Sequence, residues 1–473
     1  MINRASRLSG EFDGDSLAAE VVSKAKPDSE SRTRAMFPLR MSSIERLHFH
    51  DDWPEFPNQI FARAQFRGEL NLQCAREALI AAARRHVWSN AVVRGGRDGA
   101  WRWEWDESTE PQFVWQGDQP FQFEPIDLRR GPVCRMVGRS LPEGCELTFQ
   151  VHHAVVDGLG GLQYLRDWLV IYDNLISGRP HEAGLPELDI ERLRDRNRLG
   201  LLKRKYLLNL WRQGIGLFGA SKFLFRRFAT IQAPSVEADE NSAGFPNYEV
   251  ASWNESELSV VRKFVRREKI SLNDWLLAAL FLSLQQWHEE QFGSGLSGWS
   301  RLIVPINLRT PEDRLLPAAN RASLVQLDRR PQLERDQLAL AKGISYELGL
   351  IRDWQLDRMF LLLVRGMSVS DAWLRSAVGR RKPRATSMLT NVGKPLLRLG
   401  LPLEAGRVLS GGLRLELLDV IGPIRYGMPL SFAVAEYAGD LRMTAHFDRQ
   451  RLSSEQVQAL VRRIEQQVKA IGS

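Results

Sequence analysis

Two regions of alternating helical and strand-like patterns, separated by a basic segment, constrain the fold of this 473-residue chain more than any other feature. Apolar residues recur at helical spacing in some stretches and at every second position in others. Elements of these two kinds bury their apolar sides in packed layers, so the pattern favours an α/β fold with two sandwich-like lobes. We predict a flexible lead-in over 1–34, a first lobe over 35–185, a basic crossover over 186–247 and a second lobe over 248–473.

Individual elements can be placed within these regions. Asn71 is a candidate N-cap for a helix that ends near His86, and the tryptophans of Trp101–Trp105 alternate with charged residues as in a half-buried strand. Strands are predicted in the second region at 248–253, 301–307, 388–392, 413–420, 429–437 and 441–447. Helices are predicted there at 255–269, 271–288, 332–348 and 454–470.

The positive charge of the chain is concentrated in one segment. The formal charge is +8, from 65 Lys and Arg against 57 Asp and Glu. Eleven of those basic residues, and only one of the acids, lie between Arg192 and Arg227, so the remainder is close to neutral. We therefore do not expect nucleic-acid binding. Interleaved Leu, Phe and Trp predict either a crossover helix with a solvated basic face or, over 192–228, contact with an anionic membrane or a phosphate-rich donor.

Cysteine usage and apolar runs bound the compartment. Cys74, Cys134 and Cys145 are too few and too irregularly spaced for a disulfide framework or a zinc module, which fits a reducing compartment. The first 20 residues lack an apolar core of signal-peptide length. The longest apolar runs, such as Trp275–Leu284, fall short of the ~20 residues of a membrane-spanning helix. We expect a cytoplasmic protein, and the basic segment offers it a means of peripheral contact with a membrane.

The strongest local signal is HHAVVDG at 152–158, which follows directly on a predicted strand. Side chains alternate along a strand, so His152 belongs to its last position and His153 is the first residue outside the ladder. An imidazole has a pKa near ~6.5 and can accept a proton at neutral pH. Asp157 can brace the turn or pair with a basic residue, and Gly158 permits unusual dihedrals and close approach of backbone.

Three other interpretations of this segment were weighed. His152 and His153 could be ordinary residues at a strand end. His-His-x-x-x-Asp also offers metal ligands, but no other His/Cys/Asp cluster completes a site, so no metal is expected. A Ser-His-Asp hydrolase is favoured less than a metal site, because the sequence contains no G-x-S-x-G elbow.

HHAVVDG resembles the HHxxxDG motif of the chloramphenicol-acetyltransferase-like superfamily, which includes condensation domains and several acyltransferase branches. Other segments match in chain order. MSSIERLHF resembles the opening helix of the superfamily, and Arg85-His86 the pair that ends the next helix. SLNDWLLAALFLSL, IVPINLR with Asn320-Arg321, and LTNVGKP are similar to segments of the wax ester synthase/diacylglycerol acyltransferase branch. The resemblance spans about Met41 to Gln467.

The resemblance implies direct transfer of an acyl group from a thioester to a hydroxyl or amine acceptor, without a covalent intermediate. His153 would be the general base, and His152 and Asp157 would be structural. Gly158, Thr390 and Asn391 would contact substrate, in a tunnel between two chloramphenicol-acetyltransferase-like lobes. Acyl-CoA or a carrier-bound thioester would be a co-substrate, with no permanently bound cofactor.

Departures from the family pattern keep a second class of function open. Asn90 stands where condensation domains carry the arginine that pairs with the motif Asp, so any basic partner of Asp157 must come from elsewhere. Gly393-Lys394 replaces the usual Pro-Gly, and no D-F-G-W-G segment is present. The alternative is a non-catalytic, condensation-like binding module for acylated or peptidic ligands. Asn273 and Asp274 are expected to cap and orient a helix rather than touch substrate.

Overall fold

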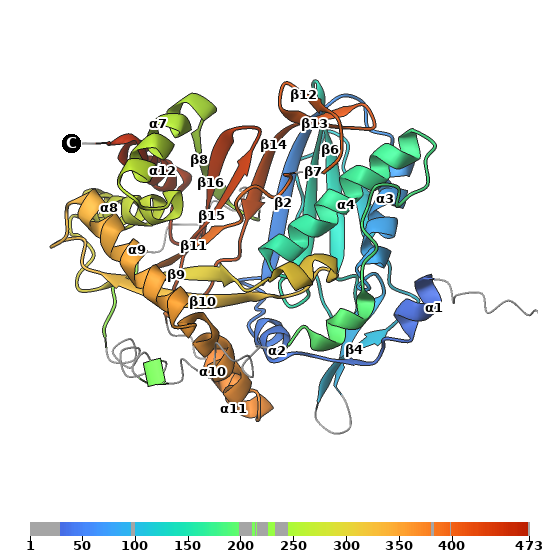
Figure 1. Cartoon of the computed structure of the whole chain (residues 1–473), viewed down its shortest axis with the longest axis horizontal. Helices are drawn as coiled ribbons and strands as arrows, with labels where there is room; N and C mark the ends of the chain where they lie inside the picture. Colours follow the sequence, from blue (N-terminus) through green and yellow to red (C-terminus); the bar gives the residue numbers. More distant parts are fainter. Residues whose placement is uncertain are drawn as a thin grey trace, which may run out of the picture.

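The fold consists of two large sheets with helices packed on them, and a small third sheet (Figure 1). The computed structural model describes residues 29–95, 100–197, 211–212, 214, 226–231, 245–379, 383–397 and 399–471. The elements before the crossover are α1 Ser29–Arg34, β1 Leu39–Arg40, α2 Ser43–His50, β2 Gln59–Arg67, α3 Leu72–Arg85, β3 Ala91–Gly95, β4 Trp101–Trp105, β5 Gln112–Trp115, β6 Cys134–Leu141, β7 Gly144–His152 and α4 Gly158–Ile176. A short 3₁₀ helix covers Ile190–Asp195.

The second region begins at β8 and mixes helices with strands, including elements that its patterning did not indicate: β10, α10, α11, β12 and β13. Its elements are β8 Tyr248–Trp253, α7 Glu255–Arg267, α8 Leu272–Phe292, β9 Ser300–Asn307, β10 Ala322–Arg329, α9 Gln337–Asp353, α10 Met359–Met367, α11 Asp371–Gly379, β11 Ser387–Asn391, β12 Leu403–Glu404, β13 Arg407–Ser410, β14 Leu413–Ile421, β15 Leu430–Tyr437, β16 Asp440–Phe447 and α12 Ser454–Lys469. Helix α9 begins at Gln337 rather than 332 because the Asp336 carboxylate accepts the backbone N–H of Leu338 and caps the first turn.

The first sheet has the order β12-β13-β14-β2-β7-β6-β5, and α3 and α4 pack together on it (Figure 1). Its centre is the antiparallel pair of β2 and β7, in which Gln59 lies opposite His152. β14 pairs antiparallel with β2, from Arg414 opposite Arg67 to Ile421 opposite Phe61. The range 248–473 therefore supplies strands to both sheets. Alternation along β14 shows that it is a strand, but it carries no information about which sheet it joins.

The second sheet has the order β10-β9-β11-β15-β16-β8, with α8 packed between α9 and α12. β11 pairs in parallel with β9 on one side and β15 on the other, so the ends of β9 and β11 emerge at the same edge. α8 is apolar on every side and buried from Asp274 to Leu284, which explains why this part of its sequence lacks a polar stripe. Each large sheet has its own hydrophobic cluster, and the two lobes of the predicted α/β fold are present.

Polar side chains fix the helix starts that position the site. The predicted N-cap Asn71 is confirmed, since its Oδ1 accepts the backbone N–H of Cys74 at 3.0 Å. Ser271 and Asp274 form a reciprocal capping box at the start of α8, so the capping role expected of Asp274 is confirmed. Asp157 is the N-cap of α4, which places Gly158 in the first helical turn.

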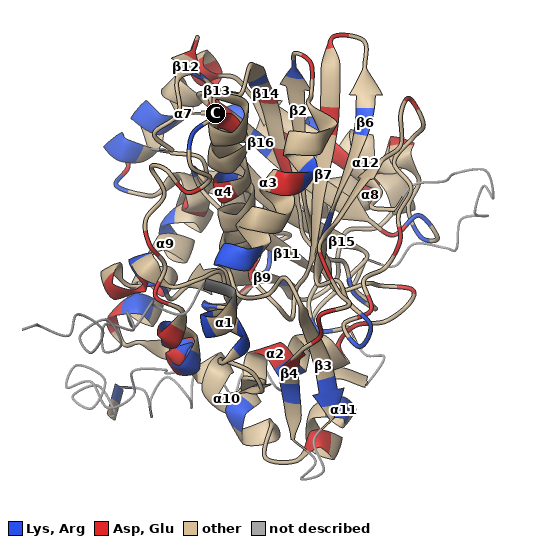
Figure 2. Cartoon of the chain, turned by 90° about the vertical axis from the view of Figure 1, so that its right-hand side faces the viewer, with Lys and Arg blue, Asp and Glu red and all other residues tan. Residues whose placement is uncertain are grey.

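Acidic and basic residues are interspersed in the view of Figure 2. No helix among the described residues is long and apolar enough to cross a membrane. The basic segment 192–228 lies largely outside the described residues, so its predicted contact with an anionic membrane stays a prediction.

Candidate active site

His153 follows the last residue of β7, as the sequence predicts for the first residue beyond the ladder. Its backbone N–H donates to the carbonyl of Asn58 at 2.8 Å, and its carbonyl accepts from Nδ2 of Asn320 at 2.9 Å. The backbone is thus held from both lobes. The side chain is partly exposed, and its buried Nδ1 has no hydrogen-bond partner among the described residues. The backbone of His153 is therefore fixed, while its Nδ1 makes no hydrogen bond to the described part of the chain.

His153 stacks on His48 of α2. The two imidazole centroids lie 4.0 Å apart and the rings are inclined by 9°. Nδ2 of Asn58 donates to the backbone carbonyl of His48 at 3.1 Å. The same Nδ2 lies 3.2 Å from Nδ1 of His48, and this contact fixes the orientation of the His48 ring. Burial, and then the proximity of His153, hold the pKa of His48 well below its usual value. Two neutral rings can stack without charge repulsion, so the pair is stable at neutral pH.

The electrostatics around His153 favour its neutral form. Burial lowers the pKa of His153 to about 4, the positive charge of Arg425 acts in the same direction, and its own backbone and Asp157 oppose the shift. Arg425 forms a close ion pair with Asp51, which keeps it near the two histidines. At pH 7 the ring is therefore deprotonated and able to accept a proton.

His152 has a structural position. It is buried, its Nδ1 accepts the backbone N–H of Ala154 at 3.0 Å, and its Nε2 lies 3.3 Å from the carboxylate of Asp52. Asp52 in turn accepts the backbone N–H of Asn58 at 2.8 Å. His152 therefore joins β7 to the loop between α2 and β2, and it secures the turn from which His153 emerges.

Asp157 is paired with Arg309, which sequence reasoning did not find. Arg309 donates two hydrogen bonds to the Asp157 carboxylate, at 2.8 and 2.9 Å, and a third to the carbonyl of Ala319 at 2.8 Å. The carboxylate also accepts the backbone N–H groups of Gly160 at 2.9 Å and Arg321 at 2.7 Å. Burial opposes ionisation of Asp157, but Arg309 and these N–H groups outweigh it and the pKa lies below its usual range.

The residue at the expected arginine position has a separate, local role. The Asn90 amide donates to the carbonyl of Thr109, and its Oδ1 accepts the hydroxyl of Ser89 at 2.8 Å. Arg85 is engaged elsewhere, with Asp167 at 2.8 Å. The signal that could have found Arg309 is its place two residues after the end of β9, in IVPINLR, at the edge of the sheet that faces the motif.

Residues of the second lobe meet the motif at Gly158. A Cβ placed on Gly158 would lie 3.4 Å from Cγ1 of Val392, the residue after β11. Nδ2 of Asn391 donates to Oδ1 of Asn273 at 3.1 Å, and Thr390 is partly buried just before it. The structure thus brings Gly158 close to the end of β11, where Thr390 and Asn391 lie.

Gly160 is required for close packing rather than for its dihedral angles. It lies in the first turn of α4, and a Cβ there would be 2.9 Å from Cβ of Val156 and 3.1 Å from the carbonyl oxygen of Ala319. Gly158, Gly160 and Gly161 have no positive φ, so the unusual dihedrals that Gly158 would permit are not adopted. The small size of Gly160 lets Ala319, in the loop before β10, approach the start of α4.

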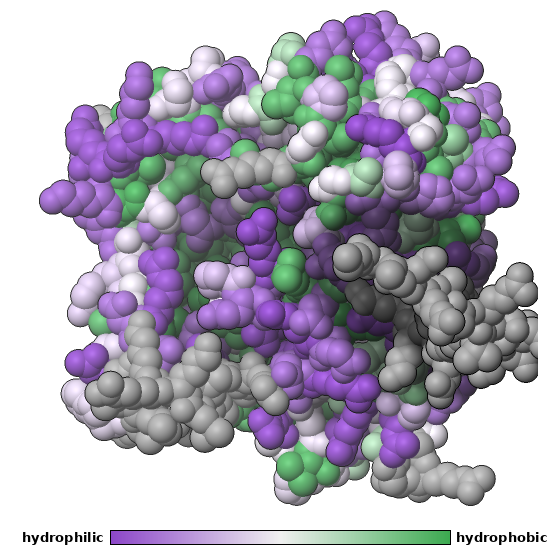
Figure 3. All heavy atoms as spheres, turned by 45° about the vertical axis from the view of Figure 1, so that its right-hand side comes forward, coloured by the Kyte–Doolittle hydropathy of each residue, from purple (hydrophilic) through white to green (hydrophobic). Residues whose placement is uncertain are grey.

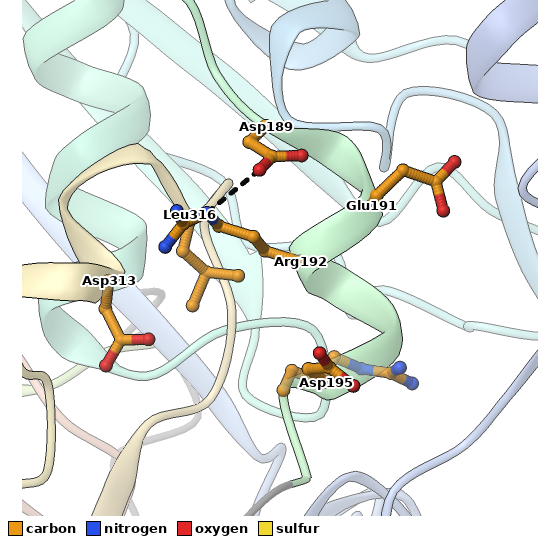
Figure 4. A pocket seen from close by; sticks show the side chains of 7 residues that line it. Asp189, Glu191, Arg192, Asp195, Asp313 and Leu316 are labelled. Carbon is orange, nitrogen blue, oxygen red and sulfur yellow. Dashed lines mark hydrogen bonds and ion pairs between the residues drawn. The ribbon is translucent and has the colours of Figure 1, made fainter.

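A pocket of about 380 Å³ lies beside this loop, on the side of the crossover (Figure 4). It is lined by Asp189, Glu191, Arg192, Asp195, Arg196, Asp313 and Leu316. Asp189 and Arg192 pair at 3.0 Å across its rim, and Asp313 lies 3.2 Å from Arg321. The lining includes no residue of HHAVVDG, so the pocket is separate from the histidines. No group of three possible metal ligands occurs in the part of the chain that the structure describes.

Comparison with solved structures identifies the fold. The chain superposes on the first condensation domain of the calcium-dependent antibiotic synthetase, in complex with a substrate analogue, with a TM-score of 0.66, 13% identity and coverage of 92% of this chain and 97% of that domain. Polyketide synthase associated protein 5 from Mycobacterium tuberculosis superposes with a TM-score of 0.60 and 16% identity, over 90% of this chain and 97% of that protein. A mutant starter condensation domain of rhizomide synthetase, in complex with C8-CoA and Leu-SNAC, superposes with a TM-score of 0.60 and 13% identity. The match covers 93% of this chain and 96% of that domain. The protein therefore has the condensation-domain fold.

Comparison with curated sequences finds a relative of higher identity that covers a smaller share of the chain. No protein-family model matches the chain. A curated relative, Uncharacterized protein Rv2305 of Mycobacterium tuberculosis, is 27% identical over 324 residues, which cover 65% of this chain and 71% of the relative.

Proposed function

We propose that the chain is a stand-alone acyltransferase that moves an acyl group from a thioester to a hydroxyl or amine acceptor. His153 carries the proposal, because its imidazole is partly exposed and neutral at pH 7, and its ring stacks on His48 without a hydrogen bond through Nδ1. Nδ1 is buried, so Nε2 is the nitrogen that receives the proton of the acceptor. Asp157 is engaged with Arg309 and two backbone N–H groups and takes no direct part.

The proposed reaction is a single displacement at the thioester carbonyl. The acceptor oxygen or nitrogen loses its proton to Nε2 of His153 and forms a bond to the carbonyl carbon. The carbon–sulfur bond then breaks, and the thiolate takes the proton from the imidazolium. Holding both reactants in line contributes about 7–11 kcal/mol towards lowering the barrier, and the general base adds to it.

Coenzyme A is the donor carrier that we propose, and the wax ester synthase branch is the nearest activity. C8-CoA is bound by the starter condensation domain of rhizomide synthetase described above. SLNDWLLAALFLSL and IVPINLR support the branch, and both segments contribute to the site: Asn273 contacts Asn391, and Arg309 binds Asp157. We propose Gly158, Thr390 and Asn391 as the residues nearest the acyl carbonyl.

The proposal is tested by thiol release. Purified protein is incubated with a series of acyl-CoA thioesters of increasing chain length, with and without alcohols or amines, and free thiol is measured. Direct transfer predicts release that depends on the acceptor, with no stoichiometric burst in its absence. A burst without acceptor would contradict the single-displacement mechanism.

A non-catalytic binding module is the alternative. One of its supports was the missing partner of Asp157, and Arg309 supplies that partner from another element. The altered LTNVGKP segment remains in its favour. The same incubation separates the two, since a binding module would retain acyl-CoA in equilibrium dialysis and release no thiol with any acceptor.

A further inference from the structure

Three large apolar side chains are exposed within eleven residues of α10, α11 and the turn that joins them. Leu363, Val369 and Trp373 are 60%, 84% and 66% exposed. Single exposed apolar residues are common on proteins and need no explanation, but a contiguous group marks a contact surface. The end of the molecule where α10 and α11 lie in Figure 1 also shows hydrophobic surface in Figure 3.

The opposite sides of the same two helices are already packed. Val364, Leu374 and Val378 are buried against Leu47 of α2 in a small cluster of their own. The inward contacts of α10 and α11 are therefore satisfied within the chain. The exposed side chains are extra to the fold, and burying them needs a surface from outside.

The charges on this face identify its partner. Arg365 and Arg375 are exposed, and neither helix carries an exposed acid, although Arg375 also lies 3.5 Å from the carboxylate of Asp371. Asp371, the one acid in the two helices, turns towards the protein, where it accepts hydrogen bonds from Arg46 at 2.7 Å and Trp101 at 2.9 Å and lies 2.9 Å from Nε2 of His50. The face is thus apolar and cationic, with a tryptophan among its exposed residues, which is the composition of helices that lie at the surface of anionic bilayers.

We propose that α10 and α11 dock the protein on an anionic lipid surface through Leu363, Val369 and Trp373, with Arg365 and Arg375 contacting headgroup phosphates. The docking surface is distinct from the basic segment 192–228, and it does not depend on the proposed chemistry. It lies close to the site, because α2 presents Leu47 to α10 and α11 and the next residue, His48, to His153. A docked protein would therefore have two layers of helix, α10 with α11 and then α2, between the lipid surface and His153.

Co-sedimentation of the full chain with vesicles tests this surface. The probes are vesicles of phosphatidylcholine alone and vesicles that also contain roughly 30% phosphatidylglycerol, which gives them a negative surface potential. We expect binding to the anionic vesicles, a drop of about tenfold in partitioning for Val369→Ser/Trp373→Ser, and a loss confined to low salt for Arg365→Gln/Arg375→Gln. Val260→Ser/Leu403→Ser removes comparably exposed apolar groups, 56% and 65% exposed, from α7 and β12 and should bind like wild type.

Each other outcome overturns the proposal. The proposal is wrong if the wild-type protein does not bind anionic vesicles. It is also wrong if Val369→Ser/Trp373→Ser binds like wild type while Lys203→Gln/Arg204→Gln/Lys205→Gln loses binding. A wild-type dimer in light scattering that the Val369→Ser/Trp373→Ser change converts to monomer would assign the face to a second copy of the chain. Failure of the proposed chemistry is separate, since His153→Ala should bind vesicles like wild type and Val369→Ser/Trp373→Ser should leave turnover of a short, water-soluble thioester unchanged.

Discussion

The ends of β7 and β16 each carry a histidine whose pKa burial lowers to about 4, yet the two side chains have different surroundings. His446 lies within β16, opposite Ser431 and Tyr248, and its Nδ1 is 2.7 Å from the carbonyl of Gly422. His153 lies just beyond β7, partly exposed, and stacks on another imidazole. The depressed pKa is common to both histidines, and the position beyond the strand ladder is what distinguishes His153, the proposed general base.

The largest effect should separate these two histidines by activity. We expect His153→Ala to lower kcat/KM for acyl transfer by about 10²–10⁴-fold, because the general base is lost, with a melting temperature close to wild type. His446→Ala should leave kcat of the folded fraction within about twofold of wild type. Acyl-transfer kinetics and thermal melts of both variants check this. A fully active His153→Ala protein would end the proposed mechanism.

Asp157 should combine the two behaviours, since it braces the turn that presents His153. Asp157→Asn removes the charge opposite Arg309 and should cost about 2–4 kcal/mol of unfolding free energy, with a partial loss of activity. Urea denaturation measures the first and kcat the second. Arg309→Gln/Asp157→Asn is the control: the double variant should be more stable than the sum of the single changes predicts, because the two groups interact directly. Wild-type stability of Asp157→Asn with no activity would assign the carboxylate to the chemistry.

His446 sharpens the comparison from the side of stability. His446→Ala leaves a small cavity and an unpaired carbonyl at Gly422, and should cost about 2 kcal/mol. His446→Gln, which can donate a hydrogen bond to that carbonyl, should recover part of the loss. If both variants melt like wild type, the hydrogen bond to Gly422 does not contribute and the two histidines differ only in exposure.

The smallest effect is on the pH dependence of stability. A histidine titrates near pH 6.5 in the unfolded chain, and in the folded chain His153 and His446 titrate near pH 4. Between these values the unfolded state binds more protons, so stability is complete above about pH 6.5 and falls as the pH is lowered towards 4. His446→Gln should reduce the fall in melting temperature over that window by about 2–4 °C. The acid limb of kcat/KM should lie well below pH 6.5 until unfolding intervenes.

The sequence was informative where structure is local. The position of His153 just past a strand, the cap at Asn71 and the capping role of Asp274 depend on residues within a few positions of each other, and all three are found as predicted. The division into two α/β lobes follows from hydrophobic periodicity, which extends over each element.

Long-range pairings could not be read in this way. Arg309 meets Asp157 from 152 residues away, and His48 meets His153 from a helix in the first part of the chain. One sequence lists the groups that can pair without stating which do. The sheet membership of β14 is unpredictable for the same reason, because its alternation is satisfied equally well on either lobe.

The pairing of β14 with β2 also has a consequence for synthesis. Arg63 of β2 and Asp419 of β14, which bond across this pair, are 356 residues apart. At about 5–20 residues per second, the ribosome needs roughly 20–70 s to deliver the partner of β2. Until then one edge of β2 has an unpaired row of backbone N–H and C=O groups, which can recruit strands from other chains. The nascent protein should therefore depend on chaperones for that interval, and a chain truncated before β12 should aggregate rather than fold as an isolated first lobe.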